Sequence, residues 1–123
     1  MAKTVLEKIR DGDAVTEIEI RHSANKHFSG YQSILINFEN DIAAFKDSKE
    51  ECFKMTCESD MAAAVEKSIK VEDIFSELED RMDEETQKEE LKEIRKKRKA
   101  VSDTFKRLKD TLGKTISDYK TGK

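Results

Sequence analysis

Apolar side chains recur at alternating spacings of three and four residues through the first half of the chain. The series consists of Phe28, Tyr31, Leu35, Phe38, Ile42, Phe45, Lys49 and Cys52, and Lys49 is its only charged member. This is the a/d spacing of a heptad repeat, which places one stripe of side chains along an α-helix. Ile34 and Ile36 widen the stripe. We therefore predict a long helix, about 14–57, that packs against more than one neighbour and buries Cys52.

Two further apolar series follow. One comprises Met61, Val65, Ile69, Val71, Ile74, Phe75, Leu78 and Met82, and it predicts a helix over about 60–82. The other is a second heptad, Leu91, Ile94, Arg98, Val101, Phe105, Leu108, Leu112, Thr115 and Tyr119, which predicts a helix over about 86–119. We expect the tail, residues 120–123, to fray.

Capping signals predict the helix boundaries near the start of the chain. Thr4-x-x-Glu7 is a capping box that opens a short helix over 4–10. Asp11-Gly12-Asp13 ends that helix, because glycine suits the left-handed position after a helix and Asp13 can cap the next one.

The two later boundaries allow alternatives. Residues 55–60 lack an apolar period, so a short loop there, with Ser59 or Asp60 as N-cap, would form an antiparallel hairpin. A single long helix with a stutter is the other interpretation. Residues 83–90 contain no apolar side chain. They include Thr86-x-x-Glu89, a second capping box with Thr86 as N-cap, so they form either a turn near 83–86 or a solvated stretch of continuous helix.

These elements predict an all-α fold. We expect one helical domain over 1–123, an elongated antiparallel bundle or coiled coil of three to four helices. The longest predicted helix would span about 65 Å, so we expect a second chain to complete the bundle. Charged residues make up 41% of the chain and hydrophobic residues 36%, which limits the core to narrow stripes. The chain has no proline and four glycines, which excludes a turn-rich sandwich or barrel and a glycine-rich phosphate loop.

Charge is divided unevenly. Residues 1–90 carry 12 basic and 23 acidic side chains, whereas residues 91–123 carry 12 basic and 4 acidic ones. The candidate anion-binding face on the last helix consists of Arg95, Lys96, Lys97, Lys99, Lys106, Arg107 and Lys109. This face could bind an anionic membrane or an acidic protein. Alternatively it pairs with the acidic block at 72–93, within the chain or between subunits. We expect nucleic acid not to be its ligand, because the segment lacks exposed aromatic residues.

No arrangement of residues indicates catalysis. His22 and His27 are five residues apart and do not share one helix face, which argues against a metal pair. Cys52 and Cys57 lack a C-x-x-C spacing, and we expect them to be reduced and structural. The carboxylates between 77 and 85 follow a polar face rather than a pocket. We expect no enzyme activity, no cofactor and no bound metal.

The sequence also bears on location. No stretch approaches the roughly 20 apolar residues of a membrane span, and the first residues lack the apolar core of a signal peptide. We therefore expect a cytoplasmic protein, with the nucleus as the alternative, that is neither secreted nor inserted in a membrane.

The heptads at 28–52 and 91–119, together with the basic run from Arg95, resemble eukaryotic coiled-coil adaptor subunits. They resemble more loosely the membrane-binding bundles of the BAR type, which are usually longer. The first resemblance implies a non-enzymatic scaffold or adaptor whose heptad faces bind partner helices in a homo- or hetero-oligomer. The second implies peripheral membrane binding through the basic face. The seam that we expect to form the core or to meet a partner is Phe28, Tyr31, Leu35, Phe38, Ile42, Phe45, Leu91, Ile94, Val101, Phe105, Leu108 and Leu112.

Overall fold

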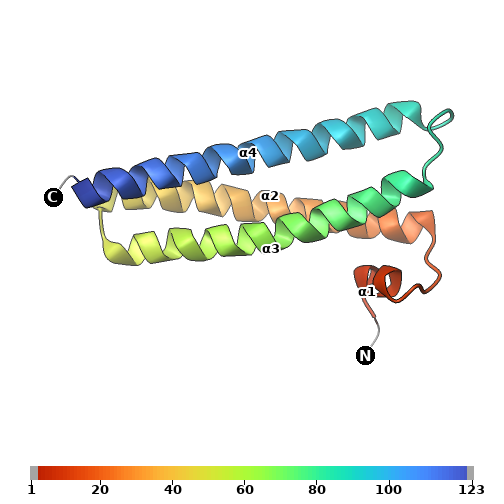
Figure 1. Ribbon diagram of the computed structural model, residues 1–123, viewed down its shortest axis with the longest axis horizontal. Coiled ribbons are helices and arrows are strands. Elements are labelled where there is room, and N and C mark those ends of the chain that lie inside the picture. Colours follow the sequence, from red (N-terminus) through yellow and green to blue (C-terminus); the bar gives the residue numbers. More distant parts are fainter. Residues whose placement is uncertain (1–2, 122–123) are drawn as a thin grey trace.

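The computed structural model describes residues 3–121 and contains four α-helices in that range (Figure 1). Helix α1 spans Val5–Arg10, α2 spans Glu17–Ser48, α3 spans Glu51–Arg81 and α4 spans Lys88–Thr121. The three long helices run up, down and up, so α3 is antiparallel to both α2 and α4. Helix α1 lies against α2 and α3, near the start of α2. The predicted all-α, elongated antiparallel bundle is confirmed.

The first capping box is confirmed, but the second helix begins later than predicted. Thr4 Oγ1 accepts a hydrogen bond from the Glu7 amide at 3.2 Å, and Gly12 follows α1 with a φ of 77°. The N-cap of α2 is Thr16 rather than Asp13. Thr16 Oγ1 accepts from the Glu19 amide at 3.2 Å, and Glu19 Oε1 accepts from the Thr16 amide at 3.4 Å. A complete capping box therefore outcompetes an isolated aspartate.

The turn between α2 and α3 corrects the sequence prediction. It consists of Lys49 and Glu50, so the predicted helices 14–57 and 60–82 become Glu17–Ser48 and Glu51–Arg81. Lys49 adopts a left-handed conformation, with a φ of 58°, and its amide donates to the Phe45 carbonyl at 2.8 Å. Lysine seldom occupies that conformation, so the sequence carries no signal for the turn. With the turn placed here, the 55–60 loop is absent, and the longest helix, α4, spans about 51 Å.

Lys49 provides a direct test of this turn. We expect Lys49→Gly to raise the free energy of unfolding by about 1 kcal/mol, because glycine adopts a positive φ without a Cβ clash. Lys46→Gly is the matched control, since Lys46 lies inside the last turn of α2. There glycine should cost about 1 kcal/mol. Urea denaturation followed by circular dichroism measures both variants, and a loss of stability in both would contradict the left-handed turn.

The boundary at residues 83–90, for which the sequence allowed a turn or a helix, contains a turn. Helix α3 ends at Arg81 and α4 begins at Lys88, with residues 82–87 between them. The Gln87 amide donates to the Asp83 carbonyl at 2.9 Å, and Gln87 Oε1 accepts from the Asp83 amide at 2.8 Å. Thr86 is therefore not the N-cap that was predicted. The predicted helix 86–119 becomes Lys88–Thr121, so Lys120 and Thr121 continue the helix, and residues 122–123 lie outside the described part.

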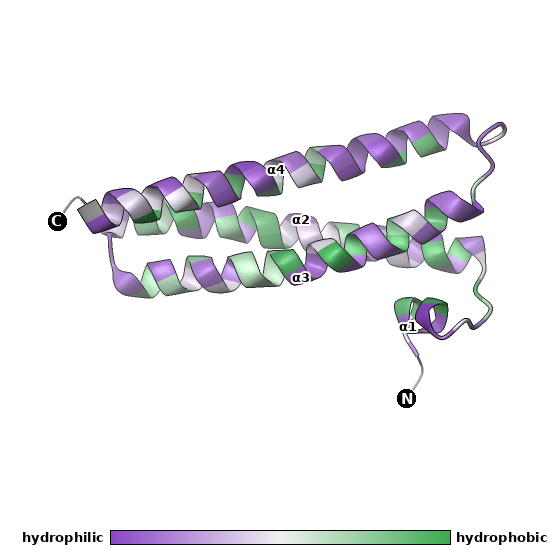
Figure 2. Ribbon diagram, in the orientation of Figure 1, coloured by the Kyte–Doolittle hydropathy of each residue, from purple (hydrophilic) through white to green (hydrophobic). Residues whose placement is uncertain are grey.

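The core lies between the three long helices, where the apolar faces meet (Figure 2). Most of the predicted seam is buried here, namely Tyr31, Leu35, Phe38, Ile42, Phe45, Leu91, Val101, Phe105, Leu108 and Leu112, while Phe28 and Ile94 are partly buried. Helices α2 and α3 pack closely, and α4 packs on them more loosely. Phe105 of α4 makes edge-on ring contacts with Tyr31 and Phe38, at centroid distances of 6.1 and 6.5 Å. These contacts hold α4 against α2.

The first half of α3 packs differently from the prediction. In that half the buried residues are Cys57 and Ala64, seven residues apart. Val65 and Ile69, which were predicted to face inward, are 43% and 55% exposed, and Cys52 is exposed while Cys57 is buried. The turn at Lys49 shifts the phase of the repeat, so small side chains face α2 and allow close approach.

Candidate functional site: a groove between helices α2 and α4

The candidate site is a groove along the line where α4 packs on α2. Its volume is about 460 Å³, and its apolar lining consists of Phe28, Leu35 and Ile36 from α2 and Ala100, Val101 and Leu108 from α4. Gln32, Glu39, Lys97 and Thr104 add polar groups. Ile36 is 61% exposed, although it faces this apolar surface. The loose packing of α4 therefore leaves apolar surface between the two helices that the chain itself does not cover.

Apart from Glu39, the α2 side of the groove is uncharged. Residues 27–38, which we call the neutral segment, contain no Asp, Glu, Lys or Arg in twelve consecutive positions, whereas 41% of the chain is charged. Phe28, Gln32, Leu35 and Ile36 of the groove all come from this segment. Its outward side chains include Ser29, Ser33 and Asn37, which are exposed. A solvated helix face in this chain would carry charges, so the neutral segment has the composition of an interface.

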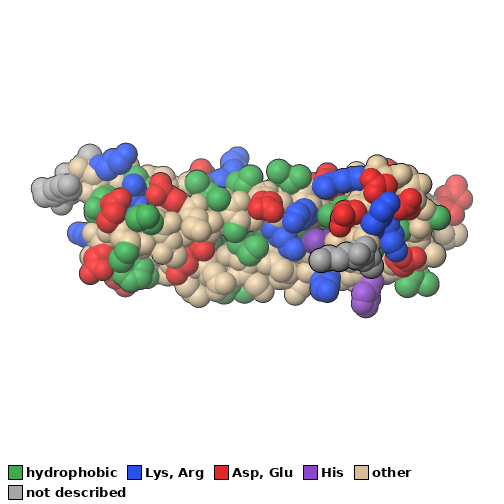
Figure 3. Space-filling model, turned by 90° about the horizontal axis from the view of Figure 1, so that it is seen from below, with side chains coloured by type: hydrophobic (Ala, Val, Ile, Leu, Met, Phe, Trp, Pro, Cys, Tyr) green, Lys and Arg blue, Asp and Glu red, His purple; other side chains and the backbone are tan. Residues whose placement is uncertain are grey.

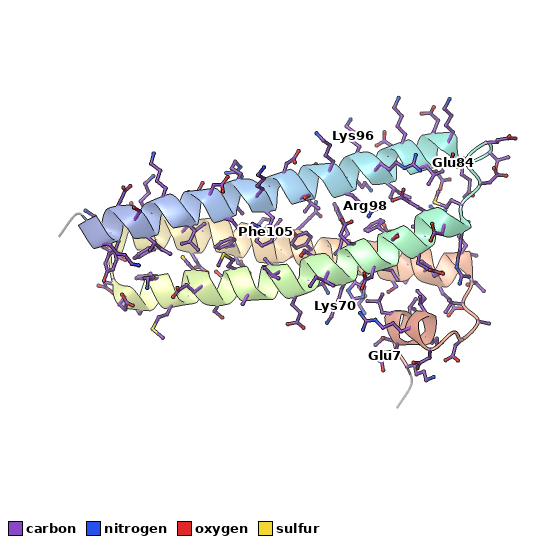
Figure 4. All side chains as sticks on the ribbon, viewed as in Figure 1. Glu7, Lys70, Glu84, Lys96, Arg98 and Phe105 are labelled. Atoms are coloured by element: carbon purple, nitrogen blue, oxygen red, sulfur yellow. The ribbon has the colours of Figure 1, made fainter. Side chains whose placement is uncertain are left out.

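The α4 side carries lysines. Lys97 lines the groove, and Lys96 projects from α4 away from the bundle (Figure 4). Among the described residues, neither lysine forms an ion pair. At one end the groove is bridged, because Arg107 Nη2 contacts Glu39 Oε2 at 3.1 Å and both side chains are more than half exposed. The groove thus has an apolar floor, an α2 wall whose one charged residue, Glu39, pairs with Arg107, and an α4 wall that carries Lys97.

The arginines of the predicted basic face have partners within the chain. Arg95 contacts Glu79 at 2.9 Å and Glu84 at 3.2 Å. Arg98, the polar exception in the α4 heptad, turns out of the seam toward α3 and pairs with Glu72 and Glu79 (Figure 4). The Glu79 side chain is only 14% exposed between these two guanidinium groups. This part of the face therefore pairs with the acidic block of α3, which was one of the two interpretations of the sequence.

The lysines of that face remain at the surface. Lys99 has an exposed ion pair with Asp103 at 3.7 Å, and the Lys109 ammonium lies 4.8 Å from the centroid of the Phe105 ring. Lys106 has no ion pair among the described residues. With 100° per residue, the five lysines from Lys96 to Lys109 spread over about two thirds of the helix circumference. The structure does not gather them on one face.

The other candidate residues are not brought into one site. His22 is exposed, and His27 contacts Lys67 of α3 instead of His22. No group of three metal-ligating side chains occurs in residues 3–121. Burial, followed by the charges of Asp41, Asp60 and Glu58, raises the pKa of the Cys57 thiol to about 11, so this cysteine stays a neutral core residue.

The sequence does indicate the groove, but through a lack of charged residues rather than through a stripe of apolar residues. The absence of charge across residues 27–38 marks the α2 wall, and only the position of α4 makes it one side of a groove.

Comparisons with known proteins yield no significant match to a family model, a curated protein or a solved structure. Within residues 3–121, no helix combines the length and apolar character needed to cross a membrane.

Proposed function

We propose that this chain is a non-enzymatic helical adaptor or scaffold subunit whose α2–α4 groove binds an amphipathic helix of a partner protein. The observation that supports this proposal best is the pairing of an apolar groove with the neutral segment in a highly charged chain. A helix in a groove presents apolar residues at i, i+3, i+4 and i+7, and it needs a long apolar channel with few charges. Ala100 and Thr104 are small, which allows the backbone of a partner helix to approach α4.

The partner helix carries acidic side chains along the edge that faces α4. Lys97 lines the groove there without an ion pair among the described residues, and on the opposite wall Glu39 is already paired with Arg107. Charge complementarity of this kind fixes the direction and register of a docked helix. A second copy of the chain suits the groove less well, because the one acidic residue of its own groove, Glu39, is already paired with Arg107.

Defined peptides test the proposal. One three-heptad peptide has leucine at a and d and glutamate on its flanks, and the second replaces every flanking glutamate by lysine. We expect the acidic peptide to bind the chain and the basic peptide to bind at least about tenfold more weakly, as measured by fluorescence anisotropy. Equal affinity for the two peptides would contradict the charge assignment.

Substitutions at exposed apolar positions locate the binding surface. Ile36→Glu places a charge in the groove and should weaken the acidic peptide at least about tenfold, because the carboxylate loses water without gaining a partner. Ile69→Glu is the matched control, since Ile69 is 55% exposed on α3 and lies outside the groove. Unchanged binding by Ile36→Glu would refute the groove as the site. A photo-crosslinker at position 36 then identifies the natural partner, whose cross-linked segment should be an acidic amphipathic helix.

Peripheral membrane binding through the basic face is the alternative function. The internal pairing of Arg95 and the spread of the lysines around α4 both favour the adaptor function. Binding to vesicles with anionic lipid that is lost in a Lys96→Glu, Lys97→Glu, Lys99→Glu variant would favour the membrane function instead.

A further inference from the structure

A second pocket lies on the other side of the bundle, where α1 meets α2 and α3. Its volume is about 580 Å³, and it shares no residue with the groove. The lining consists of Thr4 and Val5 near α1, Ile18, Glu19, His22, Ser23, Lys26 and His27 from α2, and Lys67 from α3. We call it the basic pocket. The neutral segment, the core and the arginine ion pairs do not account for the residues that line this pocket.

Positive groups from two helices converge at this pocket. Lys67 Nζ lies 2.9 Å from His27 Nδ1, and Lys26 and Lys70 raise the positive potential at both groups. Of the three lysines, only Lys70 forms an ion pair among the described residues, with Glu66 at 3.5 Å. Figure 3 shows Lys and Arg side chains close to a histidine on this side of the molecule, and Lys70 projects toward the α1 side in Figure 4. Glu66 pairs with Lys70, and its charge also opposes the lowering of the Lys67 pKa by burial and by Lys70, so this carboxylate offsets only part of the positive charge.

The one carboxylate in the lining does not neutralise the lysines. Glu19 Oε1 accepts hydrogen bonds from the amide and hydroxyl groups of Thr16 in the α2 capping box. Glu19 Oε2 lies 3.8 Å from Lys8 of α1. Glu19 therefore stabilises the α2 cap and contacts Lys8 of α1. Lys26 and Lys67 form no ion pair among the described residues.

Among the lining side chains, Lys26, Lys67 and His27 supply hydrogen-bond donors. Lys67 donates to Nδ1 of a neutral His27, so the proton of that imidazole is on Nε2, which is then a donor. Burial, followed by the charges of Lys67, Lys70 and Lys26, lowers the pKa of His27 and keeps the ring neutral. The ammonium groups of Lys26 and Lys67 supply further donors and no acceptor. A ligand that satisfies this set must be an acceptor with negative charge.

The position of Lys67 depends on a glycine inside α2. A Cβ at Gly30 would lie 3.1 Å from Lys67 Cε, which is closer than nearly all such contacts. A glycine within a helix costs about 1 kcal/mol relative to alanine. Gly30 therefore lets the Lys67 side chain lie across α2 and reach His27.

The pocket wall also has an apolar part. Val5 and Ile18 line it, and Ile18 is 77% exposed, the highest exposure among the large apolar residues of the described chain. Pockets of about 300–1,000 Å³ accommodate small organic ligands. The lining therefore combines an anion-binding set of donors with an apolar surface beside it.

We infer that the basic pocket binds a small amphipathic anion, whose oxyanion head contacts Lys26, Lys67 and His27 and whose apolar tail covers Ile18. Phosphate monoesters and carboxylates share this chemistry. The inference is independent of the adaptor function, because the pocket and the groove share no residue and lie on different helix pairs.

Titration with octyl phosphate, octanoate, inorganic phosphate and octyl glucoside tests the inference. We expect octyl phosphate and octanoate to shift the His27 ring resonances in NMR spectra and to raise the pKa of His27, because a bound anion favours the imidazolium. Octyl phosphate should bind at least about tenfold more tightly than inorganic phosphate if the tail contributes. Equal binding of octyl glucoside would overturn anion recognition, and a lack of response to every probe would overturn the site.

Variants distinguish binding in the basic pocket from general attraction to positive surface charge. Lys67→Met removes a head-group donor and keeps the aliphatic chain, so octyl phosphate should bind at least about tenfold more weakly. Gly30→Ala shifts Lys67 Cε by a few tenths of an ångström, so it should weaken binding less than Lys67→Met does. Lys106→Met on α4 is the matched control and should bind as the wild type does. If Lys106→Met lowers the affinity as much as Lys67→Met, the pocket is not the site, and vesicles with anionic lipid then test surface attraction.

Discussion

Replacing Phe38 by alanine is expected to lower the free energy of unfolding by about 3–5 kcal/mol. Phe38 is 0% exposed, and its ring contacts Phe105 of α4 at a centroid distance of 6.5 Å. The substitution removes apolar contacts to α4 and leaves a cavity at the centre of the bundle. A small domain has about 5–15 kcal/mol of stability in total, so this loss is a large part of it. Urea denaturation followed by circular dichroism measures the change.

Ile36→Ala is the control for that substitution. Ile36 is two residues away on the same helix but 61% exposed, so its truncation should change stability by no more than about 0.5–1 kcal/mol. Phe105→Ala should resemble Phe38→Ala, because Phe105 is 7% exposed and contacts both Tyr31 and Phe38. Wild-type stability in either phenylalanine variant would show that the inner face of the bundle is assigned incorrectly.

The second large effect concerns two aspartates that meet between α2 and α3. Asp60 Oδ2 is buried and has no hydrogen-bond donor, and Asp41 of α2 is its neighbour. Two ionised carboxylates have only acceptors, so a single proton must supply the donor between them. Burial, followed by the hydrogen bond and charge of Asp41, raises the pKa of Asp60 to about 7. Cys57 also lies near the pair, but its thiol stays neutral because its pKa is about 11.

This raised pKa makes stability depend on pH in a defined direction. The carboxyl of an unfolded chain titrates near 3.8, so between about pH 4 and pH 7 the folded state holds the proton more tightly. The contribution of Asp60 to stability is therefore complete below about pH 4 and is lost as the pH rises through 7. We expect Asp60→Asn to stabilise the chain at pH 8 by about 1–3 kcal/mol, because the amide donates to Asp41 at every pH.

Urea denaturation at pH 5 and at pH 8 measures this effect. The difference between Asp60→Asn and the wild type should be larger at pH 8 than at pH 5. Asp47→Asn is the control, since Asp47 is exposed near the end of α2 and has no ion pair among the described residues. Its effect should be small and equal at the two pH values. A pH dependence of Asp60→Asn identical to that of the wild type would exclude a shared proton.

The local part of the fold was predictable from the sequence. The stripe from Tyr31 to Phe45 is buried as its spacing indicates, and the break at Gly12 lies where a left-handed glycine was expected. Both depend on neighbours three or four residues apart, whose relative positions a helix sets by itself. The turn at Lys49 was missed because lysine is an uncommon residue in that conformation.

The buried face of α3 was only half predictable, for a different physical reason. Val71 and Leu78 face inward as expected, whereas Val65 is exposed and Ala64 is buried. Hydrophobicity favours the larger residue inside, but the close approach of α2 leaves room for the smaller one. The space between two helices, which no local pattern specifies, decided which residue is buried.

The sequence by itself therefore determined that the chain forms helices, where α1 ends, and which stripe of α2 faces inward. The tertiary structure decided which charged and polar residues contact one another. It pairs Arg98 with Glu72 and Glu79, and it brings His27 within 2.9 Å of Lys67, a residue forty positions away. It also turned the neutral segment into one wall of a groove. Ion pairs and grooves depend on distances between helices, and these are set only when the apolar faces pack together.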